Sequence, residues 1–220
     1  CAPGPRSVEP AHRPSGIRFS ETMVGSIEVR GGIREIETHL SVKIDDLAVF
    51  IARHARNPDV RVPIIAGTLE IERSGPIQVD PKKSYMRIMT PAPLDERGRE
   101  VRTLEYVLVP ISPNPMWERL EGEKIVRDDA GFDAWQDTTT LDLTLFTASG
   151  ELKGLMRQPA TEFFGGQLPS FEADTDDPAR QVWAMLTFGK FFFGHMVDVY
   201  FPGLAQMGDL GANLMRRSHG

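Results

Sequence analysis

The fold of this chain is decided by residues 17–44, whose sequence is IRFSETMVGSIEVRGGIREIETHLSVKI. Apolar and polar residues alternate on both sides of Gly31 and Gly32. Such a period of two is typical of strands that bury one face, and paired glycines between two such runs mark a turn. The stretch therefore predicts a β-hairpin.

Further strands are predicted along the rest of the chain, kept short by prolines and glycines. They are expected at residues 60–72, 84–89, 102–111, 124–127, 141–146 and 152–161. A short helix is expected after Asp45 and Asp46 and should end at Asn57 and Pro58. A longer helix should start at Asp176, Asp177 and Pro178, since acidic caps followed by proline favour a helix start, and should run to about Phe201.

These elements predict a mainly β (α+β) fold. We expect an antiparallel curved sheet or a lipocalin-like barrel, with a long, aromatic-rich C-terminal helix packed on it or in it. The 220 residues divide into a Pro-rich N-terminal tether (1–15), a single β-rich domain (16–201) and a C-terminal tail (202–220).

The charge of the chain argues against nucleic acid as a partner. Asp and Glu number 31 against 25 Lys and Arg, which gives a net charge of −6, whereas a phosphate backbone is bound by clustered bases. No stretch is apolar enough to span a bilayer, because the best candidate, 182–200, carries Lys190 in its middle.

The first residue, Cys1, is the only cysteine, and a Pro/Gly-rich run follows it. A chain that opens in this way looks like a mature bacterial lipoprotein, in which the signal peptide is removed just before a lipidated cysteine. We therefore expect a lipid anchor at Cys1 and a place on the periplasmic or other extracytoplasmic membrane surface. The alternative is a proteolytic boundary that falls at this cysteine.

Signatures of catalysis are missing from the sequence. It contains no G-x-S-x-G nucleophile elbow, no phosphate loop and no G-x-G-x-x-G dinucleotide fingerprint. The five histidines are far apart and none has metal-ligand spacing to another: His12, His39, His54, His195 and His219. We expect no catalytic residue, no cofactor and no metal, although a zinc site assembled from distant positions stays open.

Carboxylates gather at Asp128, Asp129, Asp133 and Asp137. Calcium binding or acid–base chemistry would explain them, but the EF-hand pattern fails for want of its glycine and closing glutamate. We favour a structural motif made of Asp133, Trp135, Asp137 and Thr138, in which the acids cap a short helix and the other two fix the next strand.

One acid, Glu21, interrupts the first apolar strand. We expect it to point outward or to pair with an arginine such as Arg34, because ionised side chains are seldom buried; a buried acid is the alternative.

The C-terminal helix carries aromatic residues nearly all round: Trp183, Phe188, Phe191, Phe192, Phe193 and Tyr200. A helix that is apolar on every side must be covered on every side. Packing in the core of the domain is the simplest explanation. The alternatives are a plug inside a barrel and a surface for a partner protein or a lipid-like ligand.

Four segments resemble a known accessory domain. They are residues 19–25 (FSETMVG), 123–141 (EKIVRDDAGFDAWQDTTTL) and the pair 188–194 (FGKFFFG) and 197–200 (VDVY). The domain occurs joined to actinobacterial cholesterol-oxidase-like (GMC-type) flavin oxidoreductases and to α/β-hydrolase-like proteins. The similarity covers most of residues 16–201, without the flavin domain, so it supplies no catalytic residue. It implies an auxiliary role near sterols, lipids or membranes.

Three functions follow as hypotheses. The first is a non-catalytic, lipid-anchored accessory subunit that docks on an integral membrane protein complex. The second is a lipocalin-like protein that binds an apolar small molecule such as a sterol, a fatty acid or a pigment. The third is an enzyme that uses carboxylates brought together by folding.

Overall fold

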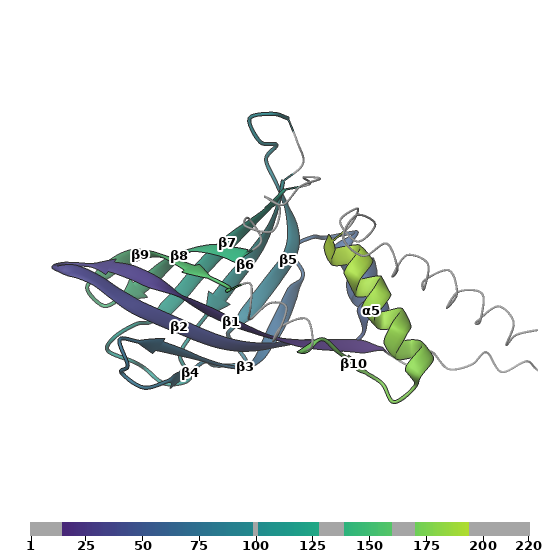
Figure 1. Ribbon diagram of the computed structural model, residues 1–220, viewed down its shortest axis with the longest axis horizontal. Coiled ribbons are helices and arrows are strands. Elements are labelled where there is room, and N and C mark those ends of the chain that lie inside the picture. Colours follow the sequence, from purple (N-terminus) through teal and green to yellow (C-terminus); the bar gives the residue numbers. More distant parts are fainter. Residues whose placement is uncertain (1–14, 99–100, 128–138, 160–169, 194–220) are drawn as a thin grey trace, which may run out of the picture.

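A computed structural model describes residues 15–98, 101–127, 139–159 and 170–193 (Figure 1). Ten strands and two helices are formed by these residues. The strands are β1 (Gly16–Val29), β2 (Gly32–Ile44), β3 (Arg61–Ile71), β4 (Ile77–Gln78), β5 (Tyr85–Ala92), β6 (Val101–Leu108), β7 (Arg119–Arg127), β8 (Thr140–Thr147), β9 (Gly150–Arg157) and β10 (Glu172–Asp174). The helices are α1 (Leu47–His54) and α5 (Pro178–Phe193).

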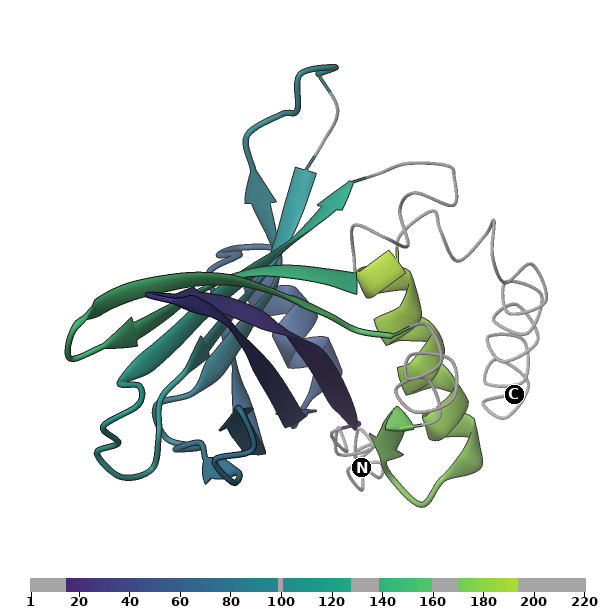
Figure 2. The same ribbon diagram turned by 60° about the vertical axis from the view of Figure 1, so that its left-hand side comes forward.

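The strands form one curved antiparallel sheet that returns to its first strand. Its order is β10-β1-β2-β3-β5-β6-β7-β8-β9, with β4 paired to β3, and β9 pairs in addition with β1. Figure 2 shows β1 (purple) beside β9 (green), where the ring of strands closes. The prediction of a mainly β fold with a curved antiparallel sheet and a C-terminal helix is confirmed.

The hairpin predicted from residues 17–44 is present in full. Strands β1 and β2 pair without interruption from Ile17 opposite Ile44 to Val29 opposite Gly32. Gly31 has φ +97°, a conformation that glycine adopts without the steric penalty of a side chain. Local patterning and turn chemistry are therefore enough to explain this hairpin.

The seam between β1 and β9 depends on two glycines. Gly25 on β1 stands opposite Met156, and Gly154 on β9 stands opposite Ile27. A Cβ added at Gly25 would lie 2.5 Å from the Cα of Met156, and one at Gly154 would lie 2.6 Å from Cγ2 of Ile27. Side chains at these positions would force the two strands apart, so glycine allows the ring to close.

One end of the ring is covered by the two helices. The carboxylate of Asp46 accepts a hydrogen bond from the amide of Val49 (3.0 Å) and caps α1, which buries Leu47 and Phe50. At the start of α5, Asp177 accepts a bond from the amide of Ala179 (3.0 Å), directly around Pro178. Both predicted helix starts are confirmed, and each has the expected cap.

Helix α5 packs on the ring rather than inside it (Figure 1). Phe188 is buried against Phe19 of β1 and Phe171, with ring centroids 5.9 and 5.5 Å apart. Lys43 of β2 forms ion pairs with Asp174 of β10 (2.9 Å) and with Asp45 (3.1 Å). The first of these helps to hold the short strand β10 to the sheet. The predicted continuation of the helix to Phe201, the tether and the tail lie outside the described residues.

Within the described part of the chain, no helix combines the length and the hydropathy that a membrane span requires.

Candidate functional site

The aromatic residues predicted on the C-terminal helix divide between the core and the surface. Phe188 is buried, while Phe191 and Phe192 are half-buried. Phe191 meets Phe50 of α1 edge to face (centroids 5.3 Å apart), and Phe192 stacks on Phe188. These side chains pack α5 against α1 and β1. Their contacts therefore agree with the interpretation that the aromatic residues of the helix pack in the core.

The opposite face of α5 presents apolar side chains to solvent. Val182, Trp183 and Met185 are exposed by 39, 38 and 37%. Leu186, one turn after Val182, is half-buried beside them. These neighbouring apolar groups, each a little more than one third exposed, form a strip that another molecule can cover.

For three of the predicted site residues the structure describes no side chain. The side chain of Phe193 and all of Tyr200 lie outside the described residues, and so does Cys1. The structural motif of Asp133, Trp135, Asp137 and Thr138 also falls outside them.

His54 lies between α1, α5 and β5. It is buried, and its Nε2 donates a hydrogen bond to the carbonyl of Ile88 (2.8 Å). Its ring meets Phe191 edge to face, with centroids 4.9 Å apart. Burial lowers the pKa of His54 below its usual value, and the positive charge of Arg102 adds to this, while bonds to the carbonyls of Ile88 and Met89 oppose it.

This environment makes the stability of the helical end depend on pH. Because the folded pKa of His54 is lowered, its contribution is fully present above the ordinary pKa of about 6.5 and is lost as pH falls below that value. One proton changes the free energy of unfolding by at most about 1.4 kcal/mol per pH unit. We expect wild type to lose stability between pH 6.5 and 5.5 relative to His54→Gln, as measured by urea unfolding at several pH values. Parallel pH profiles of the two proteins would contradict this assignment.

The expectation that Glu21 points outward or pairs with Arg34 is wrong. Glu21 lies on the inward face of β1 with Phe19 and Met23, and its side chain is 2% exposed. Arg34 pairs instead with Glu72 of the neighbouring chain segment (3.5 Å). The period of two along β1 already placed position 21 on the same side as its apolar neighbours.

Glu21, Tyr106 and Lys124 form a polar cluster buried inside the ring. The hydroxyl of Tyr106 donates to Oε2 of Glu21 (2.8 Å), and Nζ of Lys124 contacts Oε1. The ammonium also lies 5.3 Å from the centroid of the Tyr106 ring. Burial, followed by the charge of Glu21, raises the pKa of Tyr106 well above its ordinary value, so the phenol keeps the proton that it donates.

This cluster connects opposite walls of the ring, since β1 is separated from β6 and β7 by several strands in either direction. The side chain of Lys124, like that of Glu21, is only 2% exposed, so a substrate does not reach the pair. The ion pair and the hydrogen bond compensate the buried charges of Glu21 and Lys124, which would otherwise have no partner. The arrangement stabilises the geometry of the ring rather than providing a reactive group.

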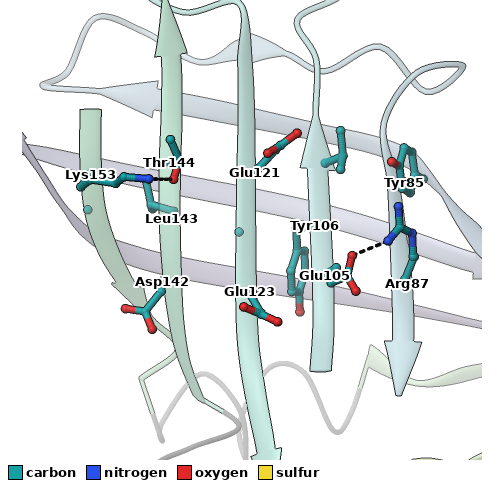
Figure 3. A pocket seen from close by; sticks show the side chains of 13 residues that line it. Tyr85, Arg87, Glu105, Tyr106, Glu121, Glu123, Asp142, Leu143, Thr144 and Lys153 are labelled. Carbon is teal, nitrogen blue, oxygen red and sulfur yellow. Dashed lines mark hydrogen bonds and ion pairs between the residues drawn. The ribbon is translucent and has the colours of Figure 1, made fainter. Parts of the chain in front are cut away.

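A second set of carboxylates lines the outer face of the sheet (Figure 3). Glu105, Glu123 and Asp142 stand directly opposite one another on β6, β7 and β8. Arg87 on β5 pairs with Glu105 (2.6 Å). Partial burial raises the pKa of Glu123, and the charges of Glu105 and Asp142 add to the rise.

A raised pKa suits a general acid, so this row is where an enzyme that uses carboxylates would act. Glu123 and Asp142 are both exposed, however, and water around them weakens every charge that a reaction would use. No three His, Cys, Asp or Glu side chains among the described residues are placed to hold a metal ion. The hollow above the row, of about 580 Å³, is a mainly acidic surface that is open to water.

Comparisons of the chain with known protein families, with curated proteins and with solved structures found no match. The similarity to the oxidase-linked accessory domain thus remains a prediction from sequence.

Proposed function

We propose that this protein is a non-catalytic accessory subunit that docks on an integral membrane protein complex through the exposed face of α5. The observation that carries the proposal is the apolar strip of Val182, Trp183 and Met185, each more than one third exposed. Buried apolar and aromatic groups supply most of the free energy of protein association, and tryptophan is among the residues most often found as hot spots.

The start of β1 lies at the same end of the ring as α5. Gly16, at the start of β1, pairs with Asp174 of β10, and β10 leads directly into α5. A lipid on Cys1, which we propose as the anchor, would be joined to this end of the ring by a segment that spans at most about 50 Å when extended. An anchored chain would thus keep the α5 end of the ring within about 50 Å of the membrane surface on the extracytoplasmic side.

The docking face is tested by Val182→Glu combined with Met185→Glu in the full chain. The matched control is Ile33→Glu, an equally drastic change at a 72% exposed residue near the β1–β2 turn. In a detergent extract of membranes from the native source, wild type and the control should elute in a complex much larger than the 24.5 kDa chain. The double variant should elute as the free chain, because two buried charges weaken association by at least a hundredfold.

Circular dichroism on the purified variants separates lost docking from lost folding. Wild type that elutes as a lone chain, or a folded double variant that stays in the complex, would contradict docking through α5.

The anchor is tested separately by the intact mass of wild type and of Cys1→Ser from the same membranes. A wild-type mass above that of the bare chain by acyl and glyceryl groups, absent from the variant, supports it. A bare-chain mass removes the anchor from the proposal and leaves the docking test unaffected.

A further inference from the structure

The end of the ring opposite α5 contains a hollow of about 900 Å³. It lies between the β1–β2 turn, the β8–β9 turn and the loop at Pro115 and Met116. Figure 1 shows the β1–β2 turn at the far left, with α5 at the other end of the molecule. Pockets that bind small molecules usually measure about 300–1,000 Å³, so the hollow is large enough for one.

The floor of this hollow is the end of the core, and its sides mix apolar with polar groups. Ile27, Ile71 and Leu145 are buried and come from three different strands, β1, β3 and β8. Leu152 and Met116 are half-buried and line the same space. An apolar group placed here would contact the partly covered side chains of Val29, Met116 and Leu152, which lie above the buried floor.

The rim carries two charges of each sign: Glu28, Arg30, Arg34 and Glu151. Arg34 is paired with Glu72 (3.5 Å), and Glu151 lies 3.9 Å from Lys153. Among the described residues, Glu28 and Arg30 make no ion pair, so one free charge of each sign remains at the rim. Such a rim favours a head group that has no net charge but presents both signs, because a single charge would meet attraction and repulsion together.

We propose that the open end of the ring binds a small amphiphile without net charge, of the alkyl phosphocholine type. Its single apolar tail contacts Val29, Met116 and Leu152, and its zwitterionic head lies at the rim between Glu28 and Arg30. Binding is non-covalent and changes no bond. The site is at the other end of the ring from the docking face, so it does not depend on the proposed docking function.

The test is titration of the full chain with dodecylphosphocholine below its micelle concentration, followed by calorimetry and tryptophan fluorescence. We expect saturable binding at one site, at least tenfold tighter than the binding of dodecanoate or dodecyltrimethylammonium. Met116→Glu and Leu152→Glu should each weaken binding at least tenfold. Leu94→Glu, a matched change at a 63% exposed leucine outside the hollow, should leave the affinity unchanged.

Two wall variants are used, so that one still tests the site if circular dichroism shows that the other does not fold. The absence of saturable binding to wild type would overturn the proposal. Wild-type affinity in both variants, if both are folded, would also overturn it. Equal affinity for a singly charged amphiphile of the same length would overturn the assignment of the head group.

Discussion

Replacing Lys124 by methionine is expected to lower the free energy of unfolding by about 3–5 kcal/mol. The substitution removes the ammonium that contacts Glu21 but keeps a side chain of similar length in the core. Glu21, 2% exposed and bonded then only to Tyr106, would be left as a buried carboxylate without a counter-charge. Urea unfolding at pH 7, with the slope checked for a two-state transition, measures the loss.

The double variant Glu21→Gln/Lys124→Met distinguishes a lost ion pair from a generally damaged core. Because it removes both charges, it should recover most of the lost stability, while the amide oxygen introduced by Glu21→Gln can still accept from Tyr106. Lys153→Met is the exposed control, since Lys153 lies 3.9 Å from Glu151 at the surface and should matter by less than about 1 kcal/mol. A single Lys124→Met variant as stable as wild type would refute the role given to this pair.

Replacing Gly25 by alanine is expected to destabilise the protein by about 3 kcal/mol and to open the ring at the β1–β9 seam. The added Cβ would lie 2.5 Å from the Cα of Met156 and closer still to the carbonyl oxygen of Leu155. Both are backbone atoms, so the strands must separate instead of a side chain turning aside. Native-state hydrogen exchange should show faster exchange for amides on both sides of the seam, and little change between β5 and β6.

Val24→Ala is the matched control for the seam. Val24 is the neighbouring residue, is 40% exposed and already carries a Cβ, so its truncation should change stability by less than about 0.5 kcal/mol. Unchanged protection of the seam amides in Gly25→Ala would show that the ring tolerates the extra carbon.

Features of the fold that depend on neighbouring residues could be predicted from the sequence. The turn at Gly31, the cap at Asp46 and the helix start at Pro178 each follow from chemistry within a few positions. The alternation along the strands likewise predicted most of their positions. The shortest strands, β4 and β10, contain two and three residues, too few for a period of two to appear.

Features that depend on distant residues could not be predicted in the same way. Glu21 and Lys124 are 103 positions apart, and the sequence around either residue does not indicate that the other is its partner. A partial signal existed, because Lys124 follows Leu120 and Gly122 at intervals of two and precedes Val126, all on the inward side of β7. Similarly, the exposure of Val182 and Met185 depends on which face of α5 meets α1 and β1, and a helix apolar on most sides does not reveal that choice.

The closure of the ring at β1 and β9 also affects how the protein behaves at high concentration. An open sheet ends in strands with unpaired amides and carbonyls, which pair readily with strands of another molecule and start aggregates. Here β1 and β9 pair with each other over four residue positions, and the short β10 continues alongside β1. Many copies crowded on a surface would therefore find few free strand edges to join, so assembly would be left to side-chain surfaces such as the face of α5.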